Sequence, residues 1–219
     1  MVYVYDPLKG DWETGWLPPQ GAMPYAPELR VGAFAGYSCS PILWTDKRLL
    51  LAYEALCAVC GALLPVRYAF RRIGEAPHMG QSAHYAGLAL DIAHAPSQPP
   101  RQQLLQMAFQ CGFDRVEPIW MTPGWLHLEA QVLPPASPRG GYPLLSQGDR
   151  GVHVFLLQDA LTMLGFYHGG LTGAFRGELK QALARFQRHK GLPITGQANS
   201  PTWYAILRAA DEQRQIEQE

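Results

Sequence analysis

The chain has 219 residues, of which 47% are hydrophobic and 16% are charged, and this composition is typical of a folded globular protein. Its 18 basic and 18 acidic side chains cancel, so we expect no nucleic-acid partner, which would need a basic face or tail. The most apolar run, Leu49 to Val66, is interrupted by Glu54 and closed by Pro65. It therefore predicts a buried helix and no membrane span. Met1 to Gly10 lack the basic and then apolar pattern of a secretory signal.

The N-terminal part of the chain mixes irregular, helical and extended patterns. Residues 1–30 are rich in Pro, Gly and aromatic side chains without a clear period, so we expect an irregular arm packed on the following domain. Asp46 to Gly61 predicts a helix, because Asp46 is a suitable cap, an apolar stripe follows at helical spacing, and Gly61 can end it. The other expected elements are strands at Val66 to Arg71 and Leu88 to Ile92, a helix at Gln102 to Cys111, and a hairpin of Val116 to Trp120 with Trp125 to Ala130. This mixture predicts an α+β domain with an antiparallel sheet.

A change in composition marks the expected domain boundary. Val132 to Pro143 contains four prolines and two adjacent glycines, which disfavour both helix and sheet. We therefore predict a first domain over residues 1–131, a linker over 132–143, and a second domain over 144–219.

The second domain contains a weak internal repeat. An apolar residue followed by glutamine occurs twice at the centre of a helical pattern, as Leu157-Gln158 and as Phe186-Gln187. Each pattern leads through glycine to a turn, and a third apolar segment begins near Trp203. This arrangement predicts a small all-α bundle of three helices.

Two histidines and one aspartate could form a metal site. His84 and Asp91 are seven residues apart with a glycine between them, and a loop entering a strand can bring them together. The alternation around His127 places His127 and Glu129 on one face of a strand. Two imidazoles and a carboxylate form a three-ligand zinc set that leaves a fourth position for water. From the spacing alone, ordinary structural histidines remain the alternative.

The pattern Ser-x-His-x-x-Gly-x-Ala-x-Asp at 82–91, followed by Trp-x-His at 125–127, resembles the zinc D-alanyl-D-alanine carboxypeptidase family. That family is related to lysostaphin-type peptidases and to the hedgehog signalling domain. The resemblance implies a hedgehog-like antiparallel sheet domain with flanking helices. It also implies that His84, Asp91 and His127 bind Zn²⁺.

The same resemblance implies two substrate contacts. Phe70-Arg71 matches an aromatic-Arg step of the family, so Arg71 is expected to steady the substrate carboxylate or the developing oxyanion. The alternative for Arg71 is a surface arginine. Ser82 is expected to offer its hydroxyl to bound peptide, and its alternative role is to cap a turn.

One position departs from the family pattern. Many members have a catalytic glutamate three residues before the last histidine, where this chain has Gly124. A general base is still needed to take the proton of the attacking water. Glu117, on the other arm of the expected hairpin, is our candidate, and Glu129 is expected to orient a ligand.

Leu145 to Leu207 resembles the peptidoglycan-binding domain of cell-wall hydrolases. In that setting Tyr167 is a candidate to stack on sugar, whereas Trp203 is expected in the core. The chain is therefore predicted to be a monomeric zinc peptidase acting at the bacterial cell wall, outside the membrane, on peptidoglycan stem peptides or crosslinks. The alternative is a catalytically degenerate peptidoglycan-binding module with a structural zinc.

Overall fold

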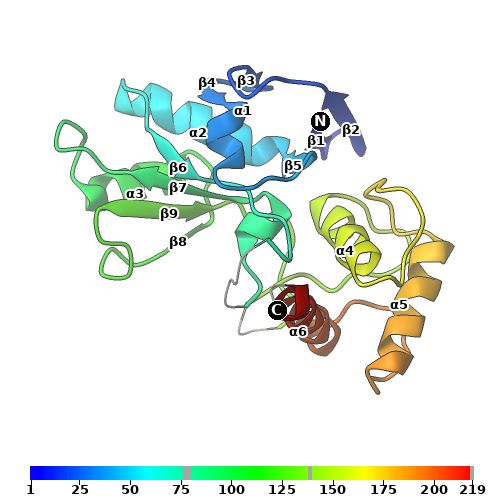
Figure 1. Ribbon diagram of the computed structural model, residues 1–219. Coiled ribbons are helices and arrows are strands. Elements are labelled where there is room, and N and C mark those ends of the chain that lie inside the picture. Colours follow the sequence, from blue (N-terminus) through cyan, green and yellow to red (C-terminus); the bar gives the residue numbers. More distant parts are fainter. Residues whose placement is uncertain (76–79, 138–139, 218–219) are drawn as a thin grey trace. The chain divides into compact units, whose positions relative to one another are not determined.

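The computed structural model describes residues 1–75, 80–137 and 140–217 (Figure 1). The chain divides into two units. The first consists of Met1–Arg71 and Ala86–Val132, and the second of Arg72–Tyr85 and Leu133–Glu219. The second change of unit falls between Val132 and Leu133, where the sequence predicts the start of the linker. The predicted first domain differs from this division, because the segment Arg72–Tyr85 has its contacts with the C-terminal part of the chain. Within the predicted linker, residues 138–139 lie outside the described residues.

The first 30 residues correct one prediction, because they form strands and not an irregular arm. Strand β1 (Val2–Asp6) is the centre of a three-stranded sheet, antiparallel to β2 (Asp11–Gly15) and parallel to β5 (Leu43–Asp46). A short hairpin of β3 (Ala22–Met23) and β4 (Ala26–Arg30) follows. Short-range periodicity could not reveal β1, since the strand is buried nearly throughout and its parallel partner lies some 40 residues away.

The second sheet of the N-terminal unit has four strands in the order β6 (Val66–Tyr68), β7 (Ala89–Ala93), β9 (Trp125–Glu129) and β8 (Arg115–Val116). All of its neighbouring pairs are antiparallel. The helices of this unit are α1 (Val31–Ala35), α2 (Lys47–Cys60) and α3 (Arg101–Gln110). The predicted α+β class and the antiparallel sheet are confirmed.

Helix α2 begins and ends where the sequence predicts. The Asp46 side chain accepts a hydrogen bond from the backbone N–H of Arg48, which satisfies a free donor of the first turn. Gly61 ends the helix in the left-handed conformation with a φ of 62°. Leu49 and Leu56 are fully buried, as expected of a core helix. Among the described residues, no helix combines the length and the apolar character that crossing a bilayer requires.

The C-terminal unit contains the three predicted helices, α4 (Val152–Met163), α5 (Gly177–His189) and α6 (Ser200–Glu217), drawn in yellow, orange and red in Figure 1. The repeated glutamines explain the internal repeat. The Gln158 amide oxygen accepts from the backbone N–H groups of Thr172 and Gly173. The Gln187 oxygen accepts in the same way from Gly196. Each buried amide therefore fastens the glycine-containing turn that follows its helix.

The segment Arg72–Tyr85 is held in the C-terminal unit by polar contacts. The Arg72 Nε lies 2.9 Å from the Asp159 Oδ2, and Asp159 is buried within α4. The Tyr142 hydroxyl donates to the carbonyl oxygen of Ser82 at 2.6 Å. Pairing with Arg72 provides a partner for a carboxylate that would be costly to bury alone.

Candidate metal centre

The register between β7 and β9 sets Asp91 directly opposite His127. Residues opposite each other in an antiparallel pair project to the same face, so the two side chains meet. The His127 Nδ1 lies 2.8 Å from the Asp91 Oδ1. On either side of His127, Leu126 and Leu128 are fully buried, which follows from the strand alternation.

His84 reaches the same place from η1 (Ala83–Ala86), the short 3₁₀ helix before β7. Gly87 allows the chain to enter the strand, because a Cβ atom there would lie 1.9 Å from the Trp44 carbonyl oxygen. The Thr45 hydroxyl also donates to the Gly87 carbonyl at 2.7 Å. Potential ligand atoms of His84, Asp91 and His127 all lie within 4.8 Å of one another.

The donor set of this cluster fits zinc. Two imidazole nitrogens and one carboxylate oxygen are ligands that Zn²⁺ takes in catalytic sites, where three protein ligands leave one position open. His84 and His127 are both buried, so water does not fully surround the cluster. Within the described ranges, no other group of three or more His, Cys, Asp or Glu side chains lies close enough to hold a metal ion.

Both ring nitrogens of His127 face carboxylates. The Nε2 lies 2.9 Å from the Glu129 Oε1, opposite the contact of Nδ1 with Asp91. Burial lowers the pKa of His127, but the hydrogen bonds to Asp91 and Glu129 outweigh it and raise the pKa to about 9. Glu129 thus contacts the second nitrogen, and its role in orienting a ligand stays a prediction.

Glu117 lies at the edge of the same sheet. Val116 pairs with Leu128, and the Glu117 backbone N–H donates to the His127 carbonyl at 3.2 Å. This register places Glu117 on the face that carries His127, as the predicted hairpin requires. The first arm is shorter than predicted, since β8 ends at Val116 and Pro118 has no N–H to continue the ladder.

Gly124 has a φ of 81°, the left-handed region that a glutamate rarely adopts. The backbone of this loop therefore suits glycine at the position where many members of the resembled family have their catalytic carboxylate.

Arg71 lies beside the cluster through Tyr68. Tyr68 pairs with Asp91 across β6 and β7. The Arg71 guanidinium carbon lies 4.6 Å from the centre of the Tyr68 ring, and its Nε donates to the Tyr68 hydroxyl. Arg71 therefore packs on a neighbour of a candidate ligand, and it is not an isolated surface arginine.

Ser82 has the capping role that the sequence offered as its alternative. Its Oγ accepts from the His84 backbone N–H at 3.3 Å, and the residue is buried. This contact supports the turn that carries His84. A direct contact of the hydroxyl with substrate stays a prediction.

Tyr167 and Trp203 both belong to the core of the C-terminal unit. Trp203 is fully buried, and its Nε1 donates to the Pro143 carbonyl, as expected of a core residue. Only 6% of Tyr167 is exposed, and its hydroxyl donates to the Gly170 carbonyl at 3.1 Å. The ring therefore offers little surface for stacking on sugar.

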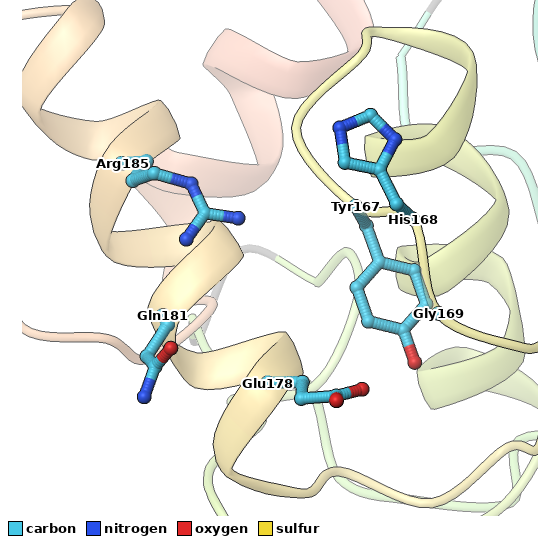
Figure 2. Close-up of a pocket in the computed structure, with 6 residues that line it drawn as sticks. All are labelled: Tyr167, His168, Gly169, Glu178, Gln181 and Arg185. Atoms are coloured by element: carbon cyan, nitrogen blue, oxygen red, sulfur yellow. The ribbon is translucent and has the colours of Figure 1, made fainter.

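Tyr167 nevertheless lines a polar pocket of about 270 Å³ between α5 and the loop after α4 (Figure 2). The other lining residues are His168, Gly169, Glu178, Gln181 and Arg185. Sequence reasoning missed the charged pair Glu178 and Arg185. Their spacing of seven residues, which is two turns along one helix face, was the available signal.

Residues 150–206, which cover α4, α5 and the first part of α6, match the family model described as a putative peptidoglycan binding domain. The C-terminal unit contains a peptidoglycan-binding domain. Its partner is therefore peptidoglycan, as the sequence predicted, and the domain associates this protein with cell wall.

Two solved structures are each similar to about a third of the chain. The SleB N-terminal domain is 34% identical, and the match covers 31% of this chain and 92% of that chain with a TM-score of 0.30. A peptidoglycan-binding protein from Clostridioides difficile, in complex with glutamine hydroxamate, is 30% identical. That match covers 32% of this chain and 44% of the other, with a TM-score of 0.31. No curated protein matches the chain.

Proposed function

We propose that this protein is a zinc peptidase that hydrolyses peptide bonds of bacterial peptidoglycan, and that its peptidoglycan-binding domain keeps it on the cell wall. The observation that carries the proposal is the cluster of His84, Asp91 and His127 in a chain that also has a peptidoglycan-binding domain. Peptidoglycan lies outside the cytoplasmic membrane, so the protein would act there.

His84, Asp91 and His127 would hold the metal. Bound zinc supplies a polarised water and stabilises negative charge on the amide oxygen. Glu129 keeps the His127 ring in its orientation by accepting from Nε2. His127 would hold the metal as a neutral imidazole, so its ring would have to lose a proton.

Glu117 is the proposed general base. It shares the sheet face of His127, which its backbone hydrogen bond to the His127 carbonyl fixes. From this face a carboxylate can accept a proton from the attacking water and deliver it to the leaving amine. Arg71, held against Tyr68, would pair with a carboxylate of the stem peptide through its planar guanidinium.

A second candidate function is a peptidoglycan-binding module with a structural metal and no catalysis. The observation that favours it is Gly124, whose backbone conformation disfavours a glutamate at that position. In this case the protein would bind zinc and cell wall, yet leave every peptide bond intact.

Incubation with purified sacculi tests the proposal. We expect new free amino groups to appear with the zinc-loaded chain, to stop with a chelator, and to return when zinc is restored. His127→Ala should lose zinc and hydrolysis together. His94→Ala is the matched control, since His94 lies outside the cluster and contacts the Pro99 carbonyl. Zinc binding without hydrolysis would support the structural-metal function instead, and full zinc content in both His84→Ala and His127→Ala would reject the centre.

A further inference from the structure

The pocket between α5 and the loop after α4 is lined by charged side chains on α5 and by an aromatic ring on the loop. In Figure 2 the side chains of Arg185 and Glu178 extend from α5 toward the loop that carries Tyr167. The loop can pass close to the Tyr167 ring because residue 169 is glycine. A Cβ atom at Gly169 would lie 2.5 Å from the Tyr167 hydroxyl oxygen.

The two charged groups remain available for a ligand. One Nη of Arg185 donates to the Phe166 carbonyl at 2.9 Å, which uses one of its five N–H groups and holds the side chain in place. The Glu178 side chain makes no hydrogen bond or ion pair within the described part of the chain, and it is exposed at the start of α5. The pocket therefore presents a fixed cation near one end and a carboxylate near the other.

The spacing of these groups defines the size of the ligand. Seven residues along a helix correspond to about 10 Å along its axis. An extended peptide covers the same distance in about three residues. A pocket of about 270 Å³ is at the small end for a ligand site, which agrees with a short peptide end.

We propose that this pocket binds the peptide part of peptidoglycan. The ligand class is a short peptide end with a carboxylate, taken by Arg185, and an ammonium group about three residues away, taken by Glu178. The inference deepens the wall-binding function of this domain and rests on it. A neutral glycan fits less well, since sugars are recognised by exposed aromatic faces and Tyr167 is almost fully buried.

The probe is the synthetic stem pentapeptide L-Ala-γ-D-Glu-L-Lys-D-Ala-D-Ala, titrated into the full chain in the presence of a chelator. Chemical shifts of the Gly169, Glu178 and Arg185 amides isolate binding in the pocket from binding at the metal centre. We expect Arg185→Gln and Glu178→Gln each to weaken this binding about tenfold, the loss of one charge-assisted hydrogen bond. Arg188→Gln, an exposed change on the same helix that lies outside the pocket, should bind like the unmodified protein.

Two further ligands separate peptide from glycan. The pentapeptide with an acetylated lysine and an amidated C-terminus should bind about as weakly as the variants do. A tetramer of N-acetylglucosamine should leave the three amide shifts unchanged. If both variants bind the pentapeptide as tightly as the unmodified protein does, or if the glycan binds more tightly than the pentapeptide, the proposal is overturned.

Sedimentation with sacculi distinguishes a failure of the pocket proposal from a failure of wall binding by the domain. If the unmodified chain sediments and the variants bind pentapeptide normally, the domain holds the wall at another place and only the pocket proposal fails. If the unmodified chain stays in solution, the wall-binding function fails.

Discussion

His127 connects the sheet to the proposed chemistry. It is buried between Asp91 and Glu129, and the strand register fixes both neighbours. When both ring nitrogens are protonated, Nδ1 donates to Asp91 and Nε2 donates to Glu129. His127 would hold zinc as a neutral imidazole, so binding of the metal would release one proton from the ring. One residue thus makes metal binding depend on both pH and sheet register.

Zinc affinity should increase with pH. Burial opposes the charged form of His127, but Asp91 and Glu129 raise its pKa to about 9, so the ring carries a proton at neutral pH. Zinc must displace this proton below about pH 9, which lowers its apparent affinity about tenfold for each pH unit of acidification. Competition with a chromophoric chelator from about pH 7 to 9 measures the slope. A zinc affinity that does not change with pH would contradict a protonated His127. Glu129→Gln should lower the pKa of His127, so the affinity should stop increasing at a lower pH.

The two carboxylates near His127 should differ in their catalytic effect. Glu117→Gln is expected to keep zinc and fold but to lower turnover by about 100-fold or more, because it removes the proton acceptor. Glu129→Gln should cost about 10- to 100-fold, because that side chain only orients a ligand. Hydrolysis rates and zinc content of both variants, measured together, test the assignment. An undiminished rate in Glu117→Gln would reject this general base.

Among the elements, the duplicated turn shows how a short sequence motif specifies structure. Gln158 and Gln187 are fully buried, and each amide satisfies backbone groups of the turn that follows its helix. Buried amides of this kind need both partners, because an unpaired buried N–H is costly. The repeat therefore reflects the same hydrogen-bonded turn formed twice. The pocket lies beside the first of these turns, which follows α4.

Replacing Gln158 should destabilise the turn at Thr172 and Gly173. Gln158→Ala leaves the backbone N–H groups of Thr172 and Gly173 without their acceptor and is expected to destabilise the domain by about 2 kcal/mol or more. Faster hydrogen exchange at Thr172 and Gly173, together with urea unfolding, would measure the effect. Gln181→Ala is the control, since this exposed glutamine should change stability by less than about 0.5 kcal/mol. Equal stability of both variants would mean that the amide does not hold the turn.

Local sequence patterns predicted the helices whose ends are marked by capping residues or turns. The strands that pair with distant segments could not be predicted in this way. The cap at Asp46, the glycine at Gly61 and the paired glutamines are local signals, so α2 and the three-helix domain were predictable. Strand β1 depends on its distant partner β5, and periodicity cannot reveal such a pairing. The contact of Asp91 with His127 likewise depends on register across 36 residues. The ligand residues were named from a motif, and their geometry came only with the sheet.

The whole molecule joins a candidate metal centre to a peptidoglycan-binding domain in one chain. The segment Arg72–Tyr85, which ends just after Ser82 and His84, is fastened within the C-terminal unit by Arg72 with Asp159 and by Tyr142 with Ser82. A linker composition alone would not predict that a piece of the first 131 residues belongs to the helical unit, since these contacts span 87 and 60 positions in sequence.

The most direct measurement is mass spectrometry of peptidoglycan fragments after digestion with the zinc-loaded chain, with and without a chelator. The proposed function predicts fragments in which stem peptides or crosslinks are cut while the glycan strands remain whole, and it predicts that the chelator and His127→Ala both abolish them. Intact peptides under all conditions, or fragments cut within the glycan, would contradict it.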